Sequence, residues 1–343
     1  MIRFFDAATI RARLDWPRVI AAIAAALRAD VHAPVRSSHA IDVPGQPSAS
    51  LLLMPAWQVG NRIGVKLVTV FPGKQPRSVA AVYVLFDALT GDPLALLEGE
   101  ELTARRTAGA SALASSYLSR SDASHLVMVG AGRQSRGLIE AHMSVRPIKR
   151  VTLWSRTAAH ASAAAATCAK DGLPVDATTD LEAAVRAADI VSCATLSTAP
   201  LVLGAWLRPG THVDLVGAFR ASMRETDDAV MQRADLIVVD DRAAALAEGG
   251  DVVQALRDGA IGLGKIAGDL RDLVAGTIAG RTGADQITVF KSVGFALEDL
   301  AAADAVYGDG GDAAGTADEA SAGRVAGSGE AIDDDVATHG IRR

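Results

Sequence analysis

Hydrophobic positions follow two different patterns along this chain of 343 residues, and the change of pattern falls near residue 118. From about residue 124 onward, short and nearly continuous apolar runs alternate with alanine-rich segments of helical character. The runs are HLVMVGAG (125–132), RVTLWSR (150–156), ADIVSCAT (188–195), THVDLVGA (211–218), ADLIVVDD (234–241) and ITVFKSVG (287–294). Buried parallel strands with crossover helices have this pattern. It predicts an α/β fold with a doubly wound parallel sheet of Rossmann type over residues 118–306.

The first 117 residues have a different pattern. Residues 1–30 predict an amphipathic helix rather than a signal peptide, because charged residues interrupt their apolar run. Apolar and alternating runs at 48–57, 62–72 and 78–99 predict strands, with a turn at LTGD (89–92). A helix rich in small residues is expected at 102–118. We therefore expect a smaller α+β domain with an antiparallel or mixed sheet over residues 1–117.

Composition narrows the class of protein further. Residues 308–343 are mostly Gly, Ala, Asp, Glu and Ser, so this tail is predicted to be disordered. The net charge of -6 gives no reason to expect nucleic acid or a membrane surface as a partner. Cys168 and Cys193 cannot form a disulfide framework, which favours a cytoplasmic protein. The histidines lack the spacing of metal ligands, so no metal site is expected.

The strongest chemical signal is the glycine-rich turn that follows the first of the later strands. HLVMVGAGRQSRG places Gly130 and Gly132 between a strand and a helix, with Ser135 where a third glycine would stand. Such a turn lets a pyrophosphate approach the backbone at a helix N-terminus. We expect a dinucleotide to contact Gly130, Ala131, Gly132, Arg133 and Gln134.

The end of the second strand of this unit bears on the choice of cofactor. NAD-binding proteins of this type usually carry an acidic residue there, which binds the ribose 2′-OH. This chain has Ser155, Arg156 and Thr157 instead. Because a guanidinium suits a 2′-phosphate, the sequence favours NADPH, with NADH as the alternative. Arg156 could also be a solvated charge at a strand end.

At this point the chain resembles the ornithine cyclodeaminase and mu-crystallin family, and is most similar to its ketimine reductase members. The matching motifs include GVKLVTVFPG, LTARRTAGASALAS, VGAGRQSRG, VGAFRASMRETDD and VFKSVGFALEDLAAA, which lie in the family's order between about residues 34 and 306. The resemblance implies a Rossmann domain, a substrate-binding and dimerisation domain formed by the N-terminal third, and a homodimer. A helix around 295–307 is expected to pack back on the N-terminal domain.

The resemblance also implies roles for individual residues. Lys66 matches the family's active-site lysine, Arg106 its carboxylate-binding arginine and Arg36 a second such arginine, and an arginine fork suits a carboxylate. His39 is a candidate proton donor, or else a structural histidine. Further substrate contacts are expected from Ser78, Phe219, Ser292 and Gly294, and further cofactor contacts from Ala194, Thr195, Val216, Gly217 and Lys291. Ser292 is also predicted to cap a helix, and Cys193 to be buried and unreactive.

Phe219 separates two chemistries within this family. Cyclodeaminases carry an aspartate just after the corresponding strand-end glycines, whereas this chain has VGAFRASMRE, with Phe219 at that place. A phenyl ring accepts no proton, so the deamination lacks its acid–base group. Asp227 and Asp228 are expected only to cap or solvate a helix start, and the role of Arg220 stays open.

The sequence therefore predicts an NAD(P)H-dependent reductase of cyclic ketimine carboxylates. Such an enzyme would convert Δ1-pyrroline-2-carboxylate to L-proline and Δ1-piperideine-2-carboxylate to L-pipecolate, with solvent, Lys66 or His39 as the proton donor. The alternatives are an ornithine cyclodeaminase, an enzyme like alanine dehydrogenase, and a non-catalytic protein that binds a small molecule.

Overall fold

The computed structural model describes residues 2–72, 74 and 78–308 of the chain. The expected disorder of the tail falls outside these residues, apart from Gly308, which is the last residue of a helix. The described residues belong to one compact unit. It contains two separate sheets, as the sequence predicts, and the fold class is confirmed.

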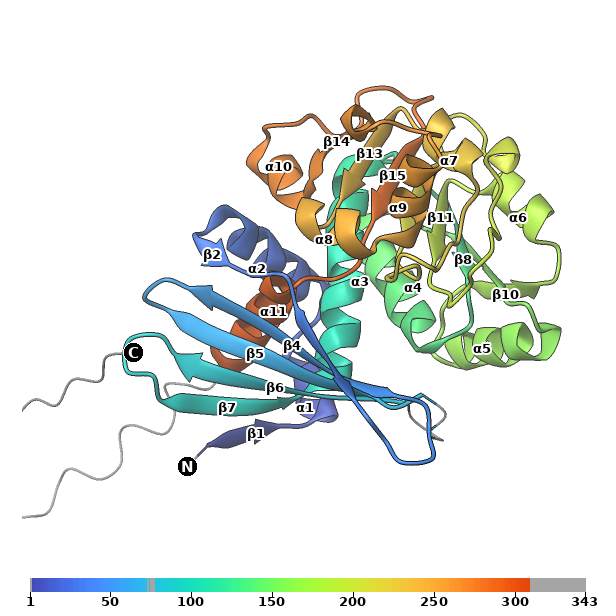
Figure 1. Ribbon diagram of the computed structural model, residues 1–343. Helices are drawn as coiled ribbons and strands as arrows, with labels where there is room; N and C mark the ends of the chain where they lie inside the picture. The colour runs from blue at the N-terminus through green and yellow to red at the C-terminus, as the bar shows by residue number, and fades with distance from the viewer. Residues whose placement is uncertain (1, 73, 75–77, 309–343) are drawn as a thin grey trace, which may run out of the picture. The chain divides into compact units, whose positions relative to one another are not determined.

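The larger sheet is parallel throughout and lies in the C-terminal half of the chain (Figure 1). Its strands are β8 (His125–Val129), β9 (Arg150–Trp154), β10 (Val175–Thr178), β11 (Ile190–Cys193), β12 (His212–Leu215), β13 (Leu236–Val239), β14 (Ile266–Asp269) and β15 (Thr288–Lys291). Their order is β10-β9-β8-β11-β12-β15-β13-β14. Successive strands are therefore added on one side of β8 up to β10 and on its other side from β11 onward. Ligands of doubly wound sheets bind at the carboxyl ends of the strands where the strand order reverses in this way.

Helices separate most of these strands and cover the sheet. They are α4 (Arg133–Val145), α5 (Ala158–Lys170), α6 (Leu181–Ala187), α7 (Asp228–Arg233), α8 (Arg242–Glu248), α9 (Gly250–Arg257) and α10 (Leu270–Ala275). Asp227 caps α7, accepting a hydrogen bond from the backbone N–H of Val230 at 3.2 Å. The capping role predicted for this aspartate is therefore confirmed. Cys193 is fully buried, and burial raises the pKa of its thiol well above the ordinary range.

The smaller sheet is formed by the N-terminal third. Its strands are β1 (Arg3–Phe5), β2 (Val31–His32), β3 (Ser37–Ile41), β4 (Ala49–Gln58), β5 (Arg62–Val70), β6 (Val79–Asp87) and β7 (Pro93–Glu98). They pair antiparallel, except that β1 lies parallel to β7. The mixed sheet that the alternating pattern predicts is thus present. One of its faces carries a buried row formed by Met54, Lys66, Tyr83 and Leu97, which are cross-strand neighbours.

Four helices belong to this half or join it to the parallel sheet. They are α1 (Ala7–Arg13), α2 (Trp16–Arg28), α3 (Gly99–Leu118) and α11 (Ala296–Gly308). The chain leaves the parallel sheet after β15, and α11 packs against α2, α3, β4 and β5 (Figure 1). The last helix therefore returns to the N-terminal half. Because α3 contacts strands of both sheets, the boundary near residue 118 stays a prediction.

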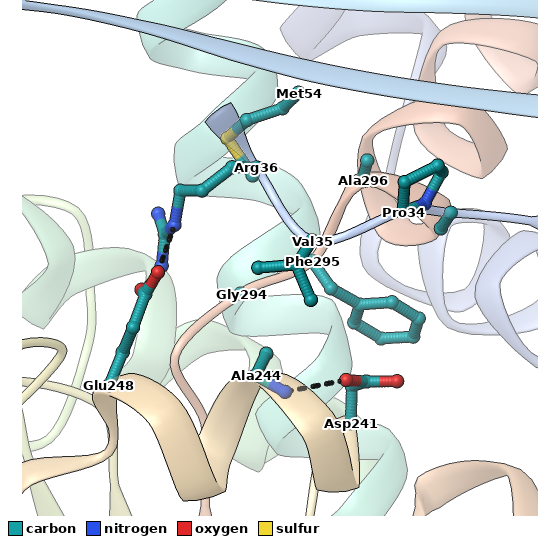
Figure 2. Close-up of a pocket in the computed structure, with 11 residues that line it drawn as sticks. Pro34, Val35, Arg36, Met54, Asp241, Ala244, Glu248, Gly294, Phe295 and Ala296 are labelled. Carbon is teal, nitrogen blue, oxygen red and sulfur yellow. Dashed lines mark hydrogen bonds and ion pairs between the residues drawn. The ribbon is translucent and has the colours of Figure 1, made fainter. Parts of the chain in front are cut away.

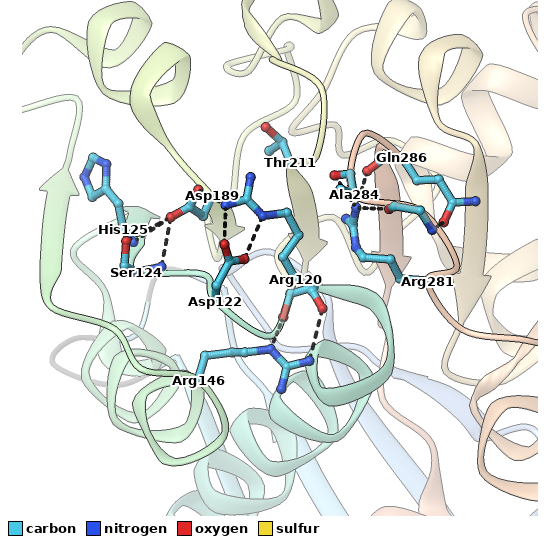
Figure 3. Close-up of polar contacts among 12 residues, drawn as sticks. Arg120, Asp122, Ser124, His125, Arg146, Asp189, Thr211, Arg281, Ala284 and Gln286 are labelled. Carbon is cyan, nitrogen blue, oxygen red and sulfur yellow. Dashed lines mark hydrogen bonds and ion pairs between the residues drawn. The ribbon is translucent and has the colours of Figure 1, made fainter.

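Two arginines, Arg146 and Arg281, fix the C-terminal end of α3, the long helix between the halves, and Figure 3 shows both side chains. Arg146 donates to the carbonyl oxygens of Ser115 and Ser116 at 2.9 and 2.7 Å, and Arg281 donates to that of Leu118 at 2.7 Å. Cations at a helix C-terminus satisfy its last carbonyl groups and its dipole. The buried α3 thereby has a fixed position against the parallel sheet, which also positions its residue Arg106.

Within the part of the chain that the structure describes, no helix is long and apolar enough to span a membrane. Those same residues contain no cluster of histidine, cysteine and acidic side chains suited to a metal ion.

Candidate active site

The turn between β8 and α4 has the shape that a nucleotide phosphate requires. Gly130 adopts a φ of 118°, and a Cβ at this position would stand 2.7 Å from the carbonyl oxygen of Ala194. Gly132 is the N-cap of α4, and no side chain caps the helix there. A Cβ on Gly132 would have no atom within 4 Å, so the helix N-terminus is accessible. Uncapped N–H groups at a helix N-terminus bind anions, which fits a dinucleotide.

The remaining residues of this turn differ in their contacts, and their binding of a cofactor stays a prediction. Ser135 replaces the third glycine, and its hydroxyl donates to the carbonyl oxygen of Gly132 at 2.7 Å. Arg133 forms an exposed ion pair with Glu100. The side-chain oxygen of Gln134 is buried and has no hydrogen-bond partner among the described residues. This amide is therefore available to a bound molecule.

The end of β9 carries no carboxylate. Ser155 is half-buried, and Arg156 and Thr157 are exposed just after the strand. Arg156 forms no hydrogen bond or ion pair within the described ranges. Its guanidinium is therefore free to approach a 2′-phosphate.

A buried glutamate, Glu225, forms hydrogen bonds to the residues that follow both β11 and β12. Glu225 accepts hydrogen bonds from the backbone N–H and hydroxyl of Thr195 at 2.7 and 2.9 Å, and from the N–H of Gly217 at 2.8 Å. Burial raises the pKa of Glu225 to about 7, against the opposing effect of Lys291. Ala194 and Val216 stand beside these residues at the strand ends. Glu225 thus fixes the predicted cofactor-binding edge.

Lys291, for which the sequence predicts a cofactor contact, has a buried side chain at the end of β15. It is fully buried within β15, where its ammonium group donates to the carbonyl oxygen of Leu215 at 3.2 Å and lies 3.6 Å from Asp251. Asp251 in turn accepts hydrogen bonds from the backbone N–H groups of Glu225 and Thr226. Lys291 therefore supports the loops at the cofactor edge through buried contacts, and a contact between its side chain and a nucleotide stays a prediction.

Phe219 lies in the loop after β12, two residues beyond Gly217. It is half-buried, and its backbone N–H donates to the carbonyl oxygen of Gly217 at 2.7 Å. Arg220 is exposed, with its guanidinium 5.9 Å from the centre of the Phe219 ring. The loop therefore offers an aromatic ring at residue 219, where a cyclodeaminase would need a carboxylate.

Two of the predicted substrate-binding cations meet in a buried cluster. The ammonium group of Lys66 (β5) lies 2.8 Å from both carboxylate oxygens of Asp299 (α11). Arg106 (α3) donates through Nε to Asp299 at 3.1 Å and through Nη1 to Glu298 at 2.6 Å. Burial and the charge of Arg106 lower the pKa of Lys66 to about 8, although Asp299 opposes this effect. Burial also works against the charge of Arg106, but Asp299 and Glu298 hold its pKa above the ordinary value.

The segment after β15 joins this cluster to the parallel sheet. Asp240, at the end of β13, accepts hydrogen bonds from the hydroxyl of Ser292 at 3.1 Å and from the N–H groups of Val293 and Gly294 at 2.7 and 2.6 Å. Ser292 therefore does not cap α11, which begins at Ala296; the buried carboxylate of Asp240 binds its hydroxyl instead. Gly294 lies directly against Arg106. The end of β15 thus reaches the cation cluster.

Arg36 completes a set of three cations but has its own partner. Its guanidinium pairs with Glu248 at the end of α8, and one of these contacts, from Nε, measures 3.1 Å (Figure 2). A small pocket between them is lined by Val35, Met54, Gly294 and Phe295, among others. The charge of Arg36 contributes to the lowered pKa of Lys66. Arg36, Lys66 and Arg106 therefore act on one region.

Ser78 and His39 are not brought to this cluster. Ser78 is exposed and precedes β6, five residues along the strand from Tyr83, the cross-strand neighbour of Lys66. His39 is exposed and pairs with Leu51, which lies on the opposite face of the sheet from Met54 and Lys66. Residues three apart point to opposite faces of a strand, so the spacing from Arg36 to His39 does not place both in one pocket.

Several site residues were not predicted from the sequence: Glu225, Asp240, Asp251, Glu298 and Asp299. All are buried carboxylates. The pair Glu298 and Asp299 carries a signal in retrospect, because two acidic residues interrupt the otherwise apolar helix FALEDLAAA (295–303). Acidic side chains inside a buried helix need cationic partners, but the sequence does not say which ones.

The parallel sheet and its glycine-rich turn define a Rossmann-type dinucleotide-binding protein. Residues 5–312 match the ornithine cyclodeaminase/mu-crystallin family, and the chain belongs to this family. The predicted family is therefore confirmed.

Three known proteins indicate the range of similar chains. The Δ1-pyrroline-2-carboxylate reductase of Paracoccus denitrificans is 42% identical over 262 residues, which cover 75% of this chain and 82% of that protein. The structure of the Thermococcus litoralis Δ1-pyrroline-2-carboxylate reductase in complex with NADH and L-proline is 32% identical, with a TM-score of 0.83 over 90% of this chain and 97% of that one. An archaeal alanine dehydrogenase dimer with bound NAD is 27% identical, with a TM-score of 0.81 over 90% and 95%.

Proposed function

We propose that this protein reduces cyclic ketimine carboxylates with NAD(P)H. Its substrates are Δ1-pyrroline-2-carboxylate, which gives L-proline, and Δ1-piperideine-2-carboxylate, which gives L-pipecolate. The observation that carries the proposal is the contact between Gly294 and Arg106, because it brings a buried cation cluster to the strand ends where a dinucleotide-binding sheet holds its ligand. The names of the similar reductases support the same reaction.

The residues at the glycine-rich turn fit a nicotinamide dinucleotide. Gly132 leaves room for its pyrophosphate, Gly130 lets the turn pack closely against Ala194, and the N-terminus of α4 offers uncapped N–H groups. Gln134 offers an unpaired amide oxygen, which suits a hydroxyl donor. When bound in reduced form, this cofactor supplies the hydride that the C2 atom of a protonated imine accepts. The Thermococcus and archaeal structures hold NADH and NAD. We propose a preference for NADPH in this chain, based on Arg156 and the absence of an acid at residues 155–157.

Lys66 and Arg106 hold the substrate carboxylate in this proposal. The guanidinium uses Nε and Nη1 for its acidic partners, and its fork geometry suits a further carboxylate. Fixing the carboxylate orients the imine carbon, and orientation alone lowers the barrier of a bimolecular step. Arg36 supports this binding once the substrate carboxylate replaces Glu248 as the partner of its guanidinium.

Lys66 is also the side chain that best suits proton exchange with the imine nitrogen. Its pKa of about 8 lies close to neutral pH, where a group both donates and accepts a proton. His39 lies on the other face of the sheet and has no support as the donor. Phe219 contributes an apolar wall that excludes water from the reacting carbon.

A second copy of the chain completes the proposed assembly. The outer face of the smaller sheet carries three apolar cross-strand rows: Leu53, Leu67 and Val82; Pro55, Val65, Val84 and Leu96; and Trp57, Ile63 and Phe86. The opposite face is the one that α3 and α11 cover. An apolar sheet face that no described helix covers favours association, and the archaeal relative is a dimer. Val65→Asp with Val84→Asp should yield monomers in analytical ultracentrifugation, whereas Leu89→Asp in the exposed β6–β7 turn should not.

A substrate panel tests the proposed reaction. Purified protein is incubated with NADPH or NADH and with the pyrroline acid, the piperideine acid, or pyruvate plus ammonia, and separately with ornithine. Loss of cofactor absorbance with the cyclic imines supports the proposal. Ammonia release from ornithine without added reductant would instead indicate a cyclodeaminase, and cofactor binding without any turnover would indicate a binding protein.

A further inference from the structure

The carboxylate of Asp299 is shared between the two cations that we assign to substrate binding. Oδ1 accepts from Lys66 at 2.8 Å and from Arg106 at 3.1 Å, and Oδ2 accepts from Lys66 at 2.8 Å. Both Asp299 and Lys66 have almost no solvent exposure. Two buried cations repel each other strongly, so an anion must lie between them if both are to keep their charge.

Glu298, the residue before Asp299, contacts only one of the two cations. Glu298 accepts from Nη1 of Arg106 through one oxygen, while its Oε1 is buried without a hydrogen-bond partner among the described residues. Burial raises the pKa of Glu298 to about 8, although Arg106 opposes this effect. Asp299 is thus the carboxylate that Lys66 and Arg106 share, whereas Glu298 contacts Arg106 alone.

The backbone explains how Asp299 reaches this place. It lies on α11, in its first turn, just beyond the segment that Asp240 fixes at the end of β15. Lys66 lies on β5 and Arg106 on α3, so three elements far apart in sequence meet at one carboxylate. Asp304, on the same helix, pairs with Arg62 at 2.9 Å and is partly exposed. Asp304 is thus an aspartate on the same helix as Asp299, but it lies outside the cluster.

We propose that Asp299 is a positioning residue, which holds the Lys66 ammonium and the Arg106 guanidinium side by side so that both bind one substrate carboxylate. This role rests on the proposed reductase function. The substrate does not touch Asp299, which acts through the two cations. The other charged or titratable groups around Lys66 are Tyr83 of β6 and Arg36 of the segment before β3, and Glu298 of α11 pairs with the neighbouring Arg106.

Asp299→Asn, compared with Asp304→Asn in the full chain, tests the proposal. The asparagine keeps the shape but loses the charge, so Lys66 gives up its proton more readily. In Asp299→Asn, kcat/KM for the pyrroline acid should fall about 100-fold, mainly through KM, because one partner of a buried charge cluster is lost. The alkaline limb of its pH profile should move about one pH unit lower. Asp304→Asn should keep the wild-type profile.

A measurement without turnover separates this inference from the proposed function. In protein labelled with 13C-lysine, the Cε signal of Lys66, assigned with Lys66→Arg, reports the titration of its ammonium group. The chain has six lysines, so the spectrum is simple. The midpoint should move lower in Asp299→Asn and stay in place in Asp304→Asn. A wild-type protein without reductase activity would contradict the proposed function, and the NMR midpoints would still decide the role of Asp299.

The overturning result is an Asp299→Asn protein whose Lys66 midpoint and kcat/KM equal those of Asp304→Asn. If Asp299→Asn does not fold, Asp299→Glu replaces it, because this change keeps the charge and displaces it by one methylene. Asp299→Glu should lower kcat/KM about tenfold through misplacement of the cations. A wild-type kcat/KM in Asp299→Glu would overturn the proposal.

Discussion

Gly294 and Arg106 lie in direct contact, although one belongs to the segment after the parallel sheet and the other to the long helix before it. Gly294 has a φ of 78°, and a Cβ at this position would stand 2.2 Å from Nη1 of Arg106. The guanidinium cannot move away freely, because Glu298 and Asp299 hold it at 2.6 and 3.1 Å. Residue 294 must therefore be a glycine for two reasons: its backbone has a positive φ, and Arg106 leaves no space for a Cβ.

Gly294→Ala should therefore lower activity much more than backbone strain alone predicts. Gly276→Ala is the matched control, since Gly276 has a φ of 75° and no atom within 4 Å of the added Cβ. Each change should lower the free energy of unfolding by about 1 kcal/mol through its φ. Only Gly294→Ala should also reduce kcat/KM, by about 100-fold, because it displaces Arg106. Equal kcat/KM values for the two variants in steady-state assays would contradict the assignment of Arg106.

The charge of Lys66 gives the reaction a pH dependence. With a pKa of about 8, Lys66 is a cation at neutral pH and loses its charge as the pH rises. We expect kcat/KM to fall about tenfold per pH unit above this value, because the substrate carboxylate loses one of its partners. Lys66→Arg should move this limb to higher pH, since a guanidinium keeps its proton. An unchanged limb in Lys66→Arg would assign the ionisation to another group.

Removing the side chain at residue 66 is the simpler test of its role. Lys66→Ala should lower kcat by about 100-fold or more, if the ammonium group both binds the carboxylate and exchanges a proton. Lys265→Ala, in the short 3₁₀ helix Leu263–Lys265, is the control and should keep normal rates. Near-normal turnover in Lys66→Ala would remove Lys66 from the catalytic residues.

The glycine at the start of α4 should matter only when a nucleotide is bound. A Cβ at Gly132 meets no protein atom, so Gly132→Ala should leave the thermal stability of the free protein nearly unchanged. It should raise the Kd for NADPH by an order of magnitude, because the pyrophosphate needs close approach to this backbone. Gly262→Ala, also without contacts, is the control for isothermal titration calorimetry. Unaltered NADPH binding in Gly132→Ala would place the cofactor elsewhere.

Arg156 tests the preference between the two cofactors. Arg156→Ala should raise the KM for NADPH about 10- to 100-fold, since charge-assisted hydrogen bonds to the 2′-phosphate are lost. The KM for NADH should change little. Arg150→Ala, at the opposite end of β9, is the matched control and should alter neither value. A wild-type enzyme with a higher kcat/KM for NADH would show that Arg156 is a solvated strand-end charge.

The sequence predicts those features that depend on local pattern. Runs of apolar residues indicate the parallel strands, and Gly130 and Gly132 identify the turn because their spacing follows a strand directly. The buried carboxylates could not be predicted, because their partners are distant in sequence: Lys66 and Asp299 are 233 residues apart.

Two residues show the limits of local patterns. The sequence makes His39 a candidate proton donor, but the structure places it on the face of the sheet opposite to Lys66. Lys291 follows a strand-end pattern, and the pattern does not show that its side chain is fully buried between Leu215 and Asp251.

The central claim is the reduction of a cyclic imino acid that carries a carboxylate. It is tested most directly by measuring kcat/KM with NADPH for Δ1-pyrroline-2-carboxylate and for pyruvate plus ammonia, with the product identified by chiral chromatography. The structure predicts rapid formation of L-proline from the pyrroline acid and much slower formation of alanine. Formation of alanine at the higher rate, or no NADPH oxidation with the pyrroline acid, would contradict the account.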